Sequence, residues 1–345
     1  MTLEACGFVP VTQHTGFPPE GVLYRFPEHY ADGYYWIYYK ENMFNIKIHD
    51  FSYHKDTIFE VKPGEWPKCL NISYYDSVSG EELNPYRHLM SGCVKTFFGG
   101  EHGFHSVFHK GIPLRSIGIE IFPAYYEQYL KNIYPDEYID PAIAFHTIDQ
   151  TQDFPELVAL LKQIYHYRGE GLSARLFYEA KVAEAISLII DYSQKEKLHK
   201  PLISPEDQLM ISNVSNYIQD HFNCDLPLEH LAKIACMGTT KLKIAFKAVH
   251  NCTITQYIKE RRLSHAETLL ATTDLTVEQI ALTVGYHNAG RFATLFQQSS
   301  GLYPSEYRKL AQRKGYPLSK RSSQPITPAK CLLIPHRRNS NRVPD

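Results

Sequence analysis

Short runs of β-branched and aromatic residues, separated by Gly, Pro and Asn, dominate residues 8–122. Representative runs are 34–39 (YYWIYY), 44–48 (FNIKI), 70–75 (LNISYY) and 116–121 (SIGIEI). Runs of this length with turn residues between them are typical of antiparallel β-strands. The pattern therefore predicts that residues 1–122 form an antiparallel β domain, either a sandwich or a barrel.

From about Pro123 the apolar spacing changes to the three- and four-residue steps of amphipathic helices. We expect a short helix at 124–130, and a second at 154–165 with Pro155 in its first turn, a position that proline favours. A third helix is expected at 172–192, and its apolar stripe comprises Leu172, Leu176, Ala180, Ala183, Ile186 and Ile190. These helices, within residues 123–192, either cover the open face of the β domain or form a seam with a second copy, and the spacing leaves both alternatives open.

The rest of the chain divides into a linker, a third unit and a tail. Residues 193–205 are polar and charged and contain Pro201, which is typical of an interdomain linker. Residues 206–312 have helical spacing, whereas residues 313–345 are basic and rich in Ser and Pro and are expected to be disordered. The predicted fold class is thus α+β and multidomain, with an N-terminal β domain, a helical extension and an all-α C-terminal domain.

Composition is ordinary for a globular chain of 345 residues, with 43% apolar and 21% charged residues. The charge is uneven: Lys+Arg against Asp+Glu is 18 against 26 in residues 1–205 (net −8), 10 against 10 in 206–312, and 8 against 1 in 313–345 (net +7). A polyanionic partner is therefore expected to contact the later parts of the chain.

No apolar run approaches the roughly 20 residues that span a bilayer, and no secretion signal opens the chain. Seven cysteines without a CxxC pair indicate reduced thiols in the cytoplasm.

An internal repeat lies in the third unit. Residues 225–232 (DLPLEHLA) match residues 274–281 (DLTVEQIA) at an offset of 49. Further along the chain the offset is 50. The matched pairs are Leu242 with Phe292, Phe246 with Phe296, Asn251 with Gly301, Tyr257 with Tyr307, and Lys259 with Lys309. A unit of about 35 residues therefore occurs twice.

Each copy predicts a helix, a tight turn and a second helix. In the second copy Thr276, followed three residues later by Gln, has the spacing of a capping box. Gly285 suits a turn residue with positive φ, Asn288 suits the cap of the next helix, and Gly301 suits its end. The first copy places its turn at 236–238.

One long helix at 256–271 is expected to join the two copies. A rigid connection of this kind would place the second helix of each copy in successive major-groove segments, about 34 Å apart. One isolated helix-turn-helix is more often a packing unit, whereas two copies joined by a long helix are more specific to DNA binding. Their outward faces carry Thr, Lys, Asn and Arg, which suit hydrogen bonding to base edges and phosphates. The candidate DNA-contacting residues are Thr239, Thr240, Lys241, Lys243, Ile244, Lys247, Asn288, Arg291, Thr294 and Arg308.

Residues from about 211 to 310 resemble the AraC/XylS-type DNA-binding domain. The motifs that carry the resemblance include Leu231-Ala232, Phe246-Lys247, Arg262-Leu263, Ile280-Ala281, Gly285-Tyr286, Gly301, Pro304-Ser305 and Tyr307-Arg308. The resemblance implies a transcription regulator whose N-terminal domain, often a cupin-like β-barrel, binds a small-molecule effector or dimerises. It also implies double-stranded operator DNA, RNA polymerase and a second copy of the chain as partners, without a cofactor or an enzymatic activity.

The sequence departs from the family pattern in three places. Cys236 and Gly238 stand where the family has Gly and a capping Ser, which is expected to weaken the first turn by about 0.5 to 1 kcal/mol. Ile244 stands where the family often has Arg, so the first recognition helix is expected to act by shape, methyl contact and lysine-to-phosphate contact. Gly290 offers no side chain, so in the second helix its polar neighbours are the better candidates.

An enzymatic function is the alternative. His49 and His54, together with His102, His105 and His109, suggest a metal site, but no Glu accompanies them at a recognisable spacing. The alternative prediction is a metal-dependent cupin-type enzyme coupled to DNA binding. No GxSxG, Walker A, HExxH or GxGxxG motif is present. No cysteine has the Pro-Cys-His-Arg context of methyl-accepting DNA repair proteins, which excludes that chemistry.

Overall fold

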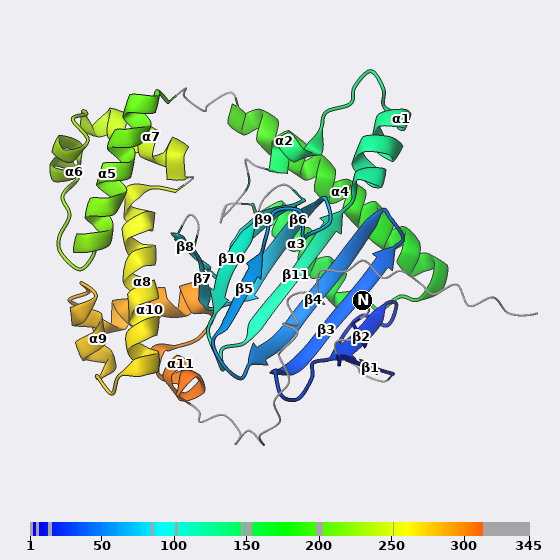
Figure 1. Cartoon of the computed structure of the whole chain (residues 1–345), viewed down its shortest axis with the longest axis horizontal. Coiled ribbons are helices and arrows are strands. Elements are labelled where there is room, and N and C mark those ends of the chain that lie inside the picture. The colour runs from blue at the N-terminus through cyan, green and yellow to red at the C-terminus, as the bar shows by residue number, and fades with distance from the viewer. Residues whose placement is uncertain are drawn as a thin grey trace, which may run out of the picture.

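A computed structural model describes residues 3–4, 7–12, 16–83, 86–100, 103–145, 148, 154–197, 203–250 and 252–312 (Figure 1). A β-rich half and a helical half lie side by side, joined by the chain between α4 and α5. The tail at 313–345 and residues 198–202 of the expected linker lie outside the described residues.

The N-terminal half is built from antiparallel strands, as predicted. They are β1 (Val9–Val11), β2 (Val22–Arg25), β3 (Ala31–Lys40), β4 (Phe44–Tyr53), β5 (Thr57–Val61), β6 (Cys69–Ser77), β7 (Gly80–Leu83), β8 (Tyr86–His88), β9 (Val94–Gly99), β10 (Phe104–Phe108) and β11 (Leu114–Ile121). One sheet has the order β1-β2-β3-β4-β11-β6-β9, and the other has the order β5-β10-β7-β8. Apolar residues of both sheets share one buried cluster, so the sheets pack face to face.

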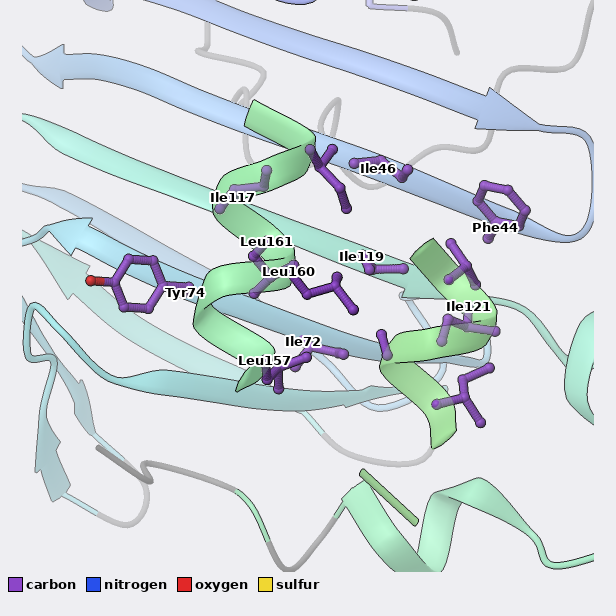
Figure 2. Close-up of a cluster of buried hydrophobic side chains, with 14 of the residues drawn as sticks. Phe44, Ile46, Ile72, Tyr74, Ile117, Ile119, Ile121, Leu157, Leu160 and Leu161 are labelled. Atoms are coloured by element: carbon purple, nitrogen blue, oxygen red, sulfur yellow. The ribbon is translucent and has the colours of Figure 1, made fainter. Parts of the chain in front are cut away.

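Strand β4 shows why the larger sheet is buried on both faces. Side chains alternate along a strand, so Phe44, Ile46 and Ile48 point to one face and Lys47 and His49 to the other. The first three belong to a core shared with the helices, visible in Figure 2, whereas the other two face the smaller sheet. The continuous buried run of this strand follows from having a partner on each side.

Within the part of the chain that the structure describes, five helical segments follow the sheets: η2 (Ala124–Leu130), α1 (Lys131–Ile133), α2 (Pro141–Phe145), α3 (Pro155–His166) and α4 (Gly171–Lys197). The helices expected at 124–130 and 154–165 are confirmed, and Pro155 occupies the first turn of α3. In Figure 2, Leu157, Leu160 and Leu161 of α3 lie against Ile72 and Ile117 of the larger sheet. The helices therefore cover the outer face of this sheet.

Helix α4 buries only part of the stripe that its apolar spacing indicated: Ile186 is buried, but the first half of the stripe is exposed. Its buried face contains Ala174, Tyr178 and Val182, whereas Leu172 and Leu176 are 72% and 58% exposed. The Tyr178 ring lies 4.5 Å from that of Tyr38 and 6.1 Å from that of Trp36, and these aromatic contacts set the rotation of the helix. The helix also continues through Lys197, so residues 193–197 of the expected linker are helical.

The described residues of the C-terminal half form seven helices: α5 (Pro205–His221), α6 (Leu228–Ile234), α7 (Thr239–His250), α8 (Ile254–Thr272), α9 (Val277–Thr283), α10 (Ala289–Ser300) and α11 (Pro304–Ala311). One core lies among α5, α6, α7 and the start of α8, and the other among the rest of α8, α9, α10 and α11. None of the helices in the described residues has an apolar stretch long enough to cross a bilayer.

Candidate nucleic-acid interface and interdomain contact

The pair α9 and α10 has the local geometry that its sequence predicted. The Thr276 side chain caps α9 in a capping box, and Gly285 forms the turn with φ +89. The Asn288 side chain accepts a hydrogen bond from the Arg291 backbone N–H at 2.8 Å, which fixes the start of α10. Gly301 ends α10 with φ +77, a left-handed conformation that favours glycine.

The pair α6 and α7 differs in its turn. Cys236 takes φ +51, a conformation that disfavours a residue with a Cβ atom. Leu231, Leu242 and Phe246 are fully buried, as the repeat predicted. The turn therefore keeps its shape, although the side chain at 236 opposes it.

Arg262 on the connecting helix holds the two helix pairs together, a role that sequence analysis missed. Its guanidinium donates to the carbonyls of Phe222 and Cys224 at 2.7 and 2.8 Å, and to the carbonyl of Gly285 at 2.9 Å. The same group lies 5.3 Å from the centre of the Tyr286 ring. One side chain thus joins the loop after α5 to the turn before α10.

Most of the candidate DNA-contacting side chains are solvent-exposed on α7 and α10. The exposed ones are Thr240, Lys241, Lys243, Ile244, Lys247, Asn288, Arg291 and Thr294, and Thr239 is half-buried. Lys241 is held by the Asp207 carboxylate at 2.7 Å. Arg308 is half-buried and donates to the Leu275 carbonyl, so part of its guanidinium is already engaged in holding α11 to the loop before α9.

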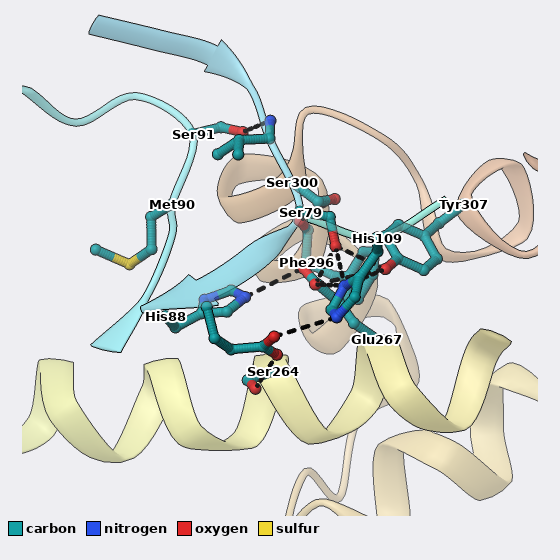
Figure 3. Close-up of polar contacts among 12 residues, drawn as sticks. Ser79, His88, Met90, Ser91, His109, Ser264, Glu267, Phe296, Ser300 and Tyr307 are labelled. Atoms are coloured by element: carbon teal, nitrogen blue, oxygen red, sulfur yellow. Dashed lines mark hydrogen bonds and ion pairs between the residues drawn. The ribbon is translucent and has the colours of Figure 1, made fainter. Parts of the chain in front are cut away.

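A buried polar cluster joins the β domain to the C-terminal helices (Figure 3). Glu267 of α8 is 1% exposed, and its carboxylate lies 3.3 Å from His88 Nε2 and 3.6 Å from His109 Nδ1. The Ser79 hydroxyl donates to Glu267 at 2.5 Å and lies 2.7 Å from the hydroxyl of Tyr307. Residues nearly 200 positions apart thus meet at one interdomain contact.

The charges in this cluster compensate one another. Burial opposes a charged imidazole, but Glu267 and Glu81 outweigh it and raise the pKa of His109 to about 10. His88 has the same balance, and Glu267 raises its pKa. Burial also opposes the carboxylate, yet the two histidines lower the pKa of Glu267. The interdomain contact therefore places a protonated His109 beside an ionised Glu267, and the same carboxylate favours the protonated form of His88.

The loop between β10 and β11 crosses from the β domain into a core of the C-terminal helices. Its Ile112 side chain is 3% exposed and packs with Leu263 and Phe296. Gly111 has φ +70, and a Cβ atom there would lie 2.4 Å from the Leu310 carbonyl oxygen, so only glycine fits. Both ends of the loop, Phe108 and Leu114, line the cavity inside the β domain.

That cavity lies between the two sheets and has a volume of about 110 Å³. Its aromatic walls are Tyr35, Phe51, Tyr53, Phe59, Trp66, Tyr75, Phe97, Phe104 and Phe108, and its polar groups come from Lys47, His49, Asn71, Ser73, Lys95 and Ser116. A cavity of about 150 Å³ in another protein holds benzene, so this one suits a compact ring-sized molecule.

The polar groups of the cavity are neutral or paired. Lys47 and Lys95 are bound at 2.8 Å by the carboxylates of Glu120 and Glu82. Burial and the nearby Lys47 lower the pKa of His49 to about 3, so this imidazole is uncharged. The cavity therefore carries no unbalanced charge from these three groups.

The histidines considered for a metal site are dispersed. His49 lies 2.8 Å from the Ser116 hydroxyl, and His54 pairs with Asp32 at 3.0 Å. His109 belongs to the interdomain cluster, and His102 lies outside the described residues. Within the part of the chain that the structure describes, no group of three or more His, Cys, Asp or Glu is arranged to hold a metal ion.

The buried thiols have no nucleophilic character. Burial and the carboxylate of Glu120 raise the pKa of the Cys69 thiol well above its ordinary value. The Cys93 thiol is also buried and donates to the Met90 carbonyl at 2.8 Å. A thiol of this kind stays protonated and inaccessible, whereas the thiolate is the reactive form.

Helix pairs with a tight turn and a polar outer helix define a helix-turn-helix DNA-binding domain. Comparison with known families gives the type: residues 231–310 match the family described as "Helix-turn-helix domain", and the domain is of the AraC type. Residues 42–201 match the family described as "Regulatory protein PchR N-terminal domain".

Individual relatives agree with this assignment. The chain is 29% identical over 122 residues to the melibiose operon regulatory protein of Escherichia coli K12, covering 35% of this chain and 40% of the relative. It is 30% identical over 106 residues to the bifunctional transcriptional activator/DNA repair enzyme AdaA of Bacillus subtilis, covering 31% and 50%. The chain thus spans about half or less of the length of these curated relatives.

Among solved structures, the chain is similar to the C-terminal domain of AraT, a response regulator from Geobacillus stearothermophilus. The two are 29% identical with a TM-score of 0.29, and the match covers 32% of this chain and 88% of that one.

Proposed function

We propose that this protein is a transcription regulator that binds operator DNA with both helix pairs and responds to a small molecule in a cupin-like N-terminal domain. The observation that carries the proposal is the AraC-type domain with polar side chains exposed on α7 and α10. The relatives whose printed names describe operon regulation add support.

In this proposal α7 and α10 are the two recognition helices. Arg291 and Thr294 on α10 contact base edges, Asn288 positions the start of that helix, and Lys243 and Lys247 on α7 contact phosphates. The remaining candidates, Thr239, Thr240, Lys241, Ile244 and Arg308, form the flanks of the same surface. Lys241 would leave the Asp207 carboxylate and bind a phosphate. Arg308 would bind DNA through the guanidinium N–H groups that do not donate to the Leu275 carbonyl.

Selection of bound fragments from random and genomic DNA tests the proposal on the full chain. Two half-elements about one helical turn apart are expected, and binding should weaken steeply with salt because phosphate contacts release counterions. Binding without any enriched sequence would contradict it.

We infer further that the cavity between the sheets holds the effector. It is enclosed by aromatic rings and carries neutral or paired polar groups, which suits a compact cyclic compound with polar substituents. The β10–β11 loop provides a physical route, because Phe108 and Leu114 contact the cavity while Ile112 contacts the helical core. A ligand that prefers one arrangement of the cavity wall would bias the attached helices.

A thermal-shift screen of small cyclic metabolites tests the effector site. A specific binder should raise the melting temperature of the wild-type chain, and Ser73→Phe, which fills the cavity, should abolish the shift. Ser305→Phe on the exposed surface of α11 is the control. A shift that survives in the Ser73 variant would place the ligand elsewhere.

We also propose that the chain forms a homodimer through α4. Leu172 and Leu176 are exposed, as are Ala180 and Ala183 on the same stripe, and small side chains permit close helix approach. Leu176→Glu should shift the sedimentation coefficient from dimer to monomer, whereas an unchanged coefficient would exclude this face. RNA polymerase is the further partner that the family implies, and co-purification on operator DNA tests it.

A further inference from the structure

Among the described residues, the β domain packs its apolar side chains against the second helix pair, α9 and α10, and not against the first, α6 and α7. Ile112 of the β10–β11 loop is 3% exposed and lies in the core of the second pair. The core of the first pair takes its described members from residues 203–258. A cavity of about 340 Å³ lies between strand β8 and the first pair, with Arg87 on one side and His250 on the other.

Polar contacts follow the same division. Ser79 and His109 of the β domain lie against Glu267, in the half of α8 that packs with the second helix pair (Figure 3). Residues 203–250, which include α5, α6 and α7, form no hydrogen bond or ion pair with the β domain in the described part of the chain. The next contact along the chain is the hydrogen bond from Gln256, in the first turn of α8, to the Met90 sulfur at 3.7 Å.

The β domain also holds the C-terminal end of α10. The last carbonyl groups of a helix have no partner within the helix. One of them, that of Ser299, accepts a hydrogen bond from the Ser91 backbone N–H at 2.7 Å. Ser300 is fully buried, and a Cβ atom on Gly301 would lie 3.2 Å from the Asp76 carbonyl oxygen of β6. The opposite end of α10 carries the side chains proposed to contact DNA, so this contact leaves them exposed.

The turn that contains Ser91 is tied to the cavity inside the β domain. Tyr75 of β6 lines that cavity. Its backbone N–H donates to the Cys93 carbonyl at 3.3 Å, and its carbonyl accepts from the Gly92 N–H at 2.7 Å. Gly92 directly follows Ser91, so a displacement of Tyr75 also displaces the donor that holds Ser299. Helix α7 has no such connection among the described residues.

We propose that the β domain controls DNA binding through the second recognition helix alone, and that Ser91 is the residue that positions this helix. Docking orients α10 before DNA binds, whereas α7 is attached through α8 and Arg262. The regulatory consequence rests on the proposed function, in which the cavity takes the effector. An effector that moves β6 changes affinity for the half-element that α10 reads and leaves the other half-element unaffected.

Two substitutions of Ser91 separate its N–H group from its side chain. Ser91→Pro removes the donor. The turn accepts proline, because Gly92 follows with φ +75, as in a type II turn that commonly has proline at the preceding position. Ser91→Ala is the matched control, since it keeps the N–H group and removes only the hydroxyl that accepts from the Val78 N–H at 3.2 Å.

Hydrogen exchange of the full chain without DNA is the first measurement. In Ser91→Pro, amides in the last turn of α10 should lose protection by about tenfold or more, while those of α7 and β4 stay as in the wild type. Ser91→Ala should keep the protection of α10. Ser73→Phe, which inserts a ring into the cavity from β6, should change the protection of α10 and not of α7. Unchanged protection of α10 in Ser91→Pro, an equal loss in Ser91→Ala, or an equal change in α7 overturns the proposal.

The second measurement uses two DNA duplexes, each with one half-element of the selected site and the other scrambled. Arg291→Ala identifies the duplex that α10 reads. Ser91→Pro should lower affinity for that duplex by about three- to tenfold and for the other by less than about twofold. Equal losses on both duplexes overturn the control through α10. Since the exchange experiment needs no DNA, failure of the proposed regulator function is distinguishable from failure of this inference.

Discussion

The buried carboxylate of Glu267 should determine how tightly the β domain holds the connecting helix α8. Glu267→Gln keeps the shape of the side chain and removes its charge. His88 then loses the carboxylate at 3.3 Å, and His109 retains Glu81 at 3.2 Å as its partner. The variant therefore tests the charge of the interdomain cluster with little change in packing.

The magnitude follows from the protonation of His109. Its pKa is raised from 6.5 to about 10. At pH 7 the part of this rise that lies above the ambient pH, about three pH units, stabilises the docked state. At about 1.4 kcal/mol per unit, the upper limit is about 4 kcal/mol. Because Glu81 remains in the variant, we expect a loss of about 2 to 4 kcal/mol, at or below the lower part of the range of about 3 to 5 kcal/mol for broken buried ion pairs.

The pH dependence has a definite sign. A raised histidine pKa stabilises the docked state fully below about pH 6.5, and this stabilisation is lost as the pH rises toward 10. The difference between wild type and Glu267→Gln should therefore be large near neutral pH and nearly vanish near pH 10.

Hydrogen exchange measured by mass spectrometry on the full chain is the assay. Amides of α8 should lose protection by about 30- to 1000-fold in Glu267→Gln near pH 7, corrected for intrinsic exchange rates, while β4 stays protected. Glu278→Gln, on the exposed face of α9, is the control. Equal α8 protection in variant and wild type, or a difference that does not shrink near pH 10, would refute the argument.

Five other substitutions test separate parts of the structure. Ile112→Ala should loosen the same contact by about 2 to 3 kcal/mol without a pH dependence, because it removes only apolar packing, and α8 exchange at two pH values checks this. Cys236→Gly should raise the free energy of unfolding by about 1 kcal/mol in urea, since it removes the Cβ atom from a residue with φ +51. Gly285→Ala should lower it by about 2 kcal/mol or more, because the new Cβ would lie 2.6 Å from the Asn223 carbonyl oxygen. Arg291→Ala should reduce affinity for the selected site by about 1 to 3 kcal/mol and relax sequence preference in one half-element, whereas Lys247→Ala should weaken all sequences alike in gel shifts.

Elements whose causes are local could be predicted from the amino-acid sequence. Thr276, Gly285, Asn288 and Gly301 were predicted as caps and turns, and each has that geometry. A cap depends on a hydrogen bond within three or four residues, so the information lies in a short window. The β-strands were predicted for a similar reason, because alternation and turn residues are local patterns.

Which faces and charges meet depends on the packing of the whole chain. The first half of the α4 apolar stripe was misassigned because the spacing does not reveal that Tyr178 fits against Tyr38 of the sheet. The contact of Ser79 with Glu267 joins residues 188 positions apart, and the hydrogen bond from Arg262 to Gly285 joins α8 to the turn before α10. Buried charges are stable only with a partner, and the chain's packing selects that partner, which no local period encodes.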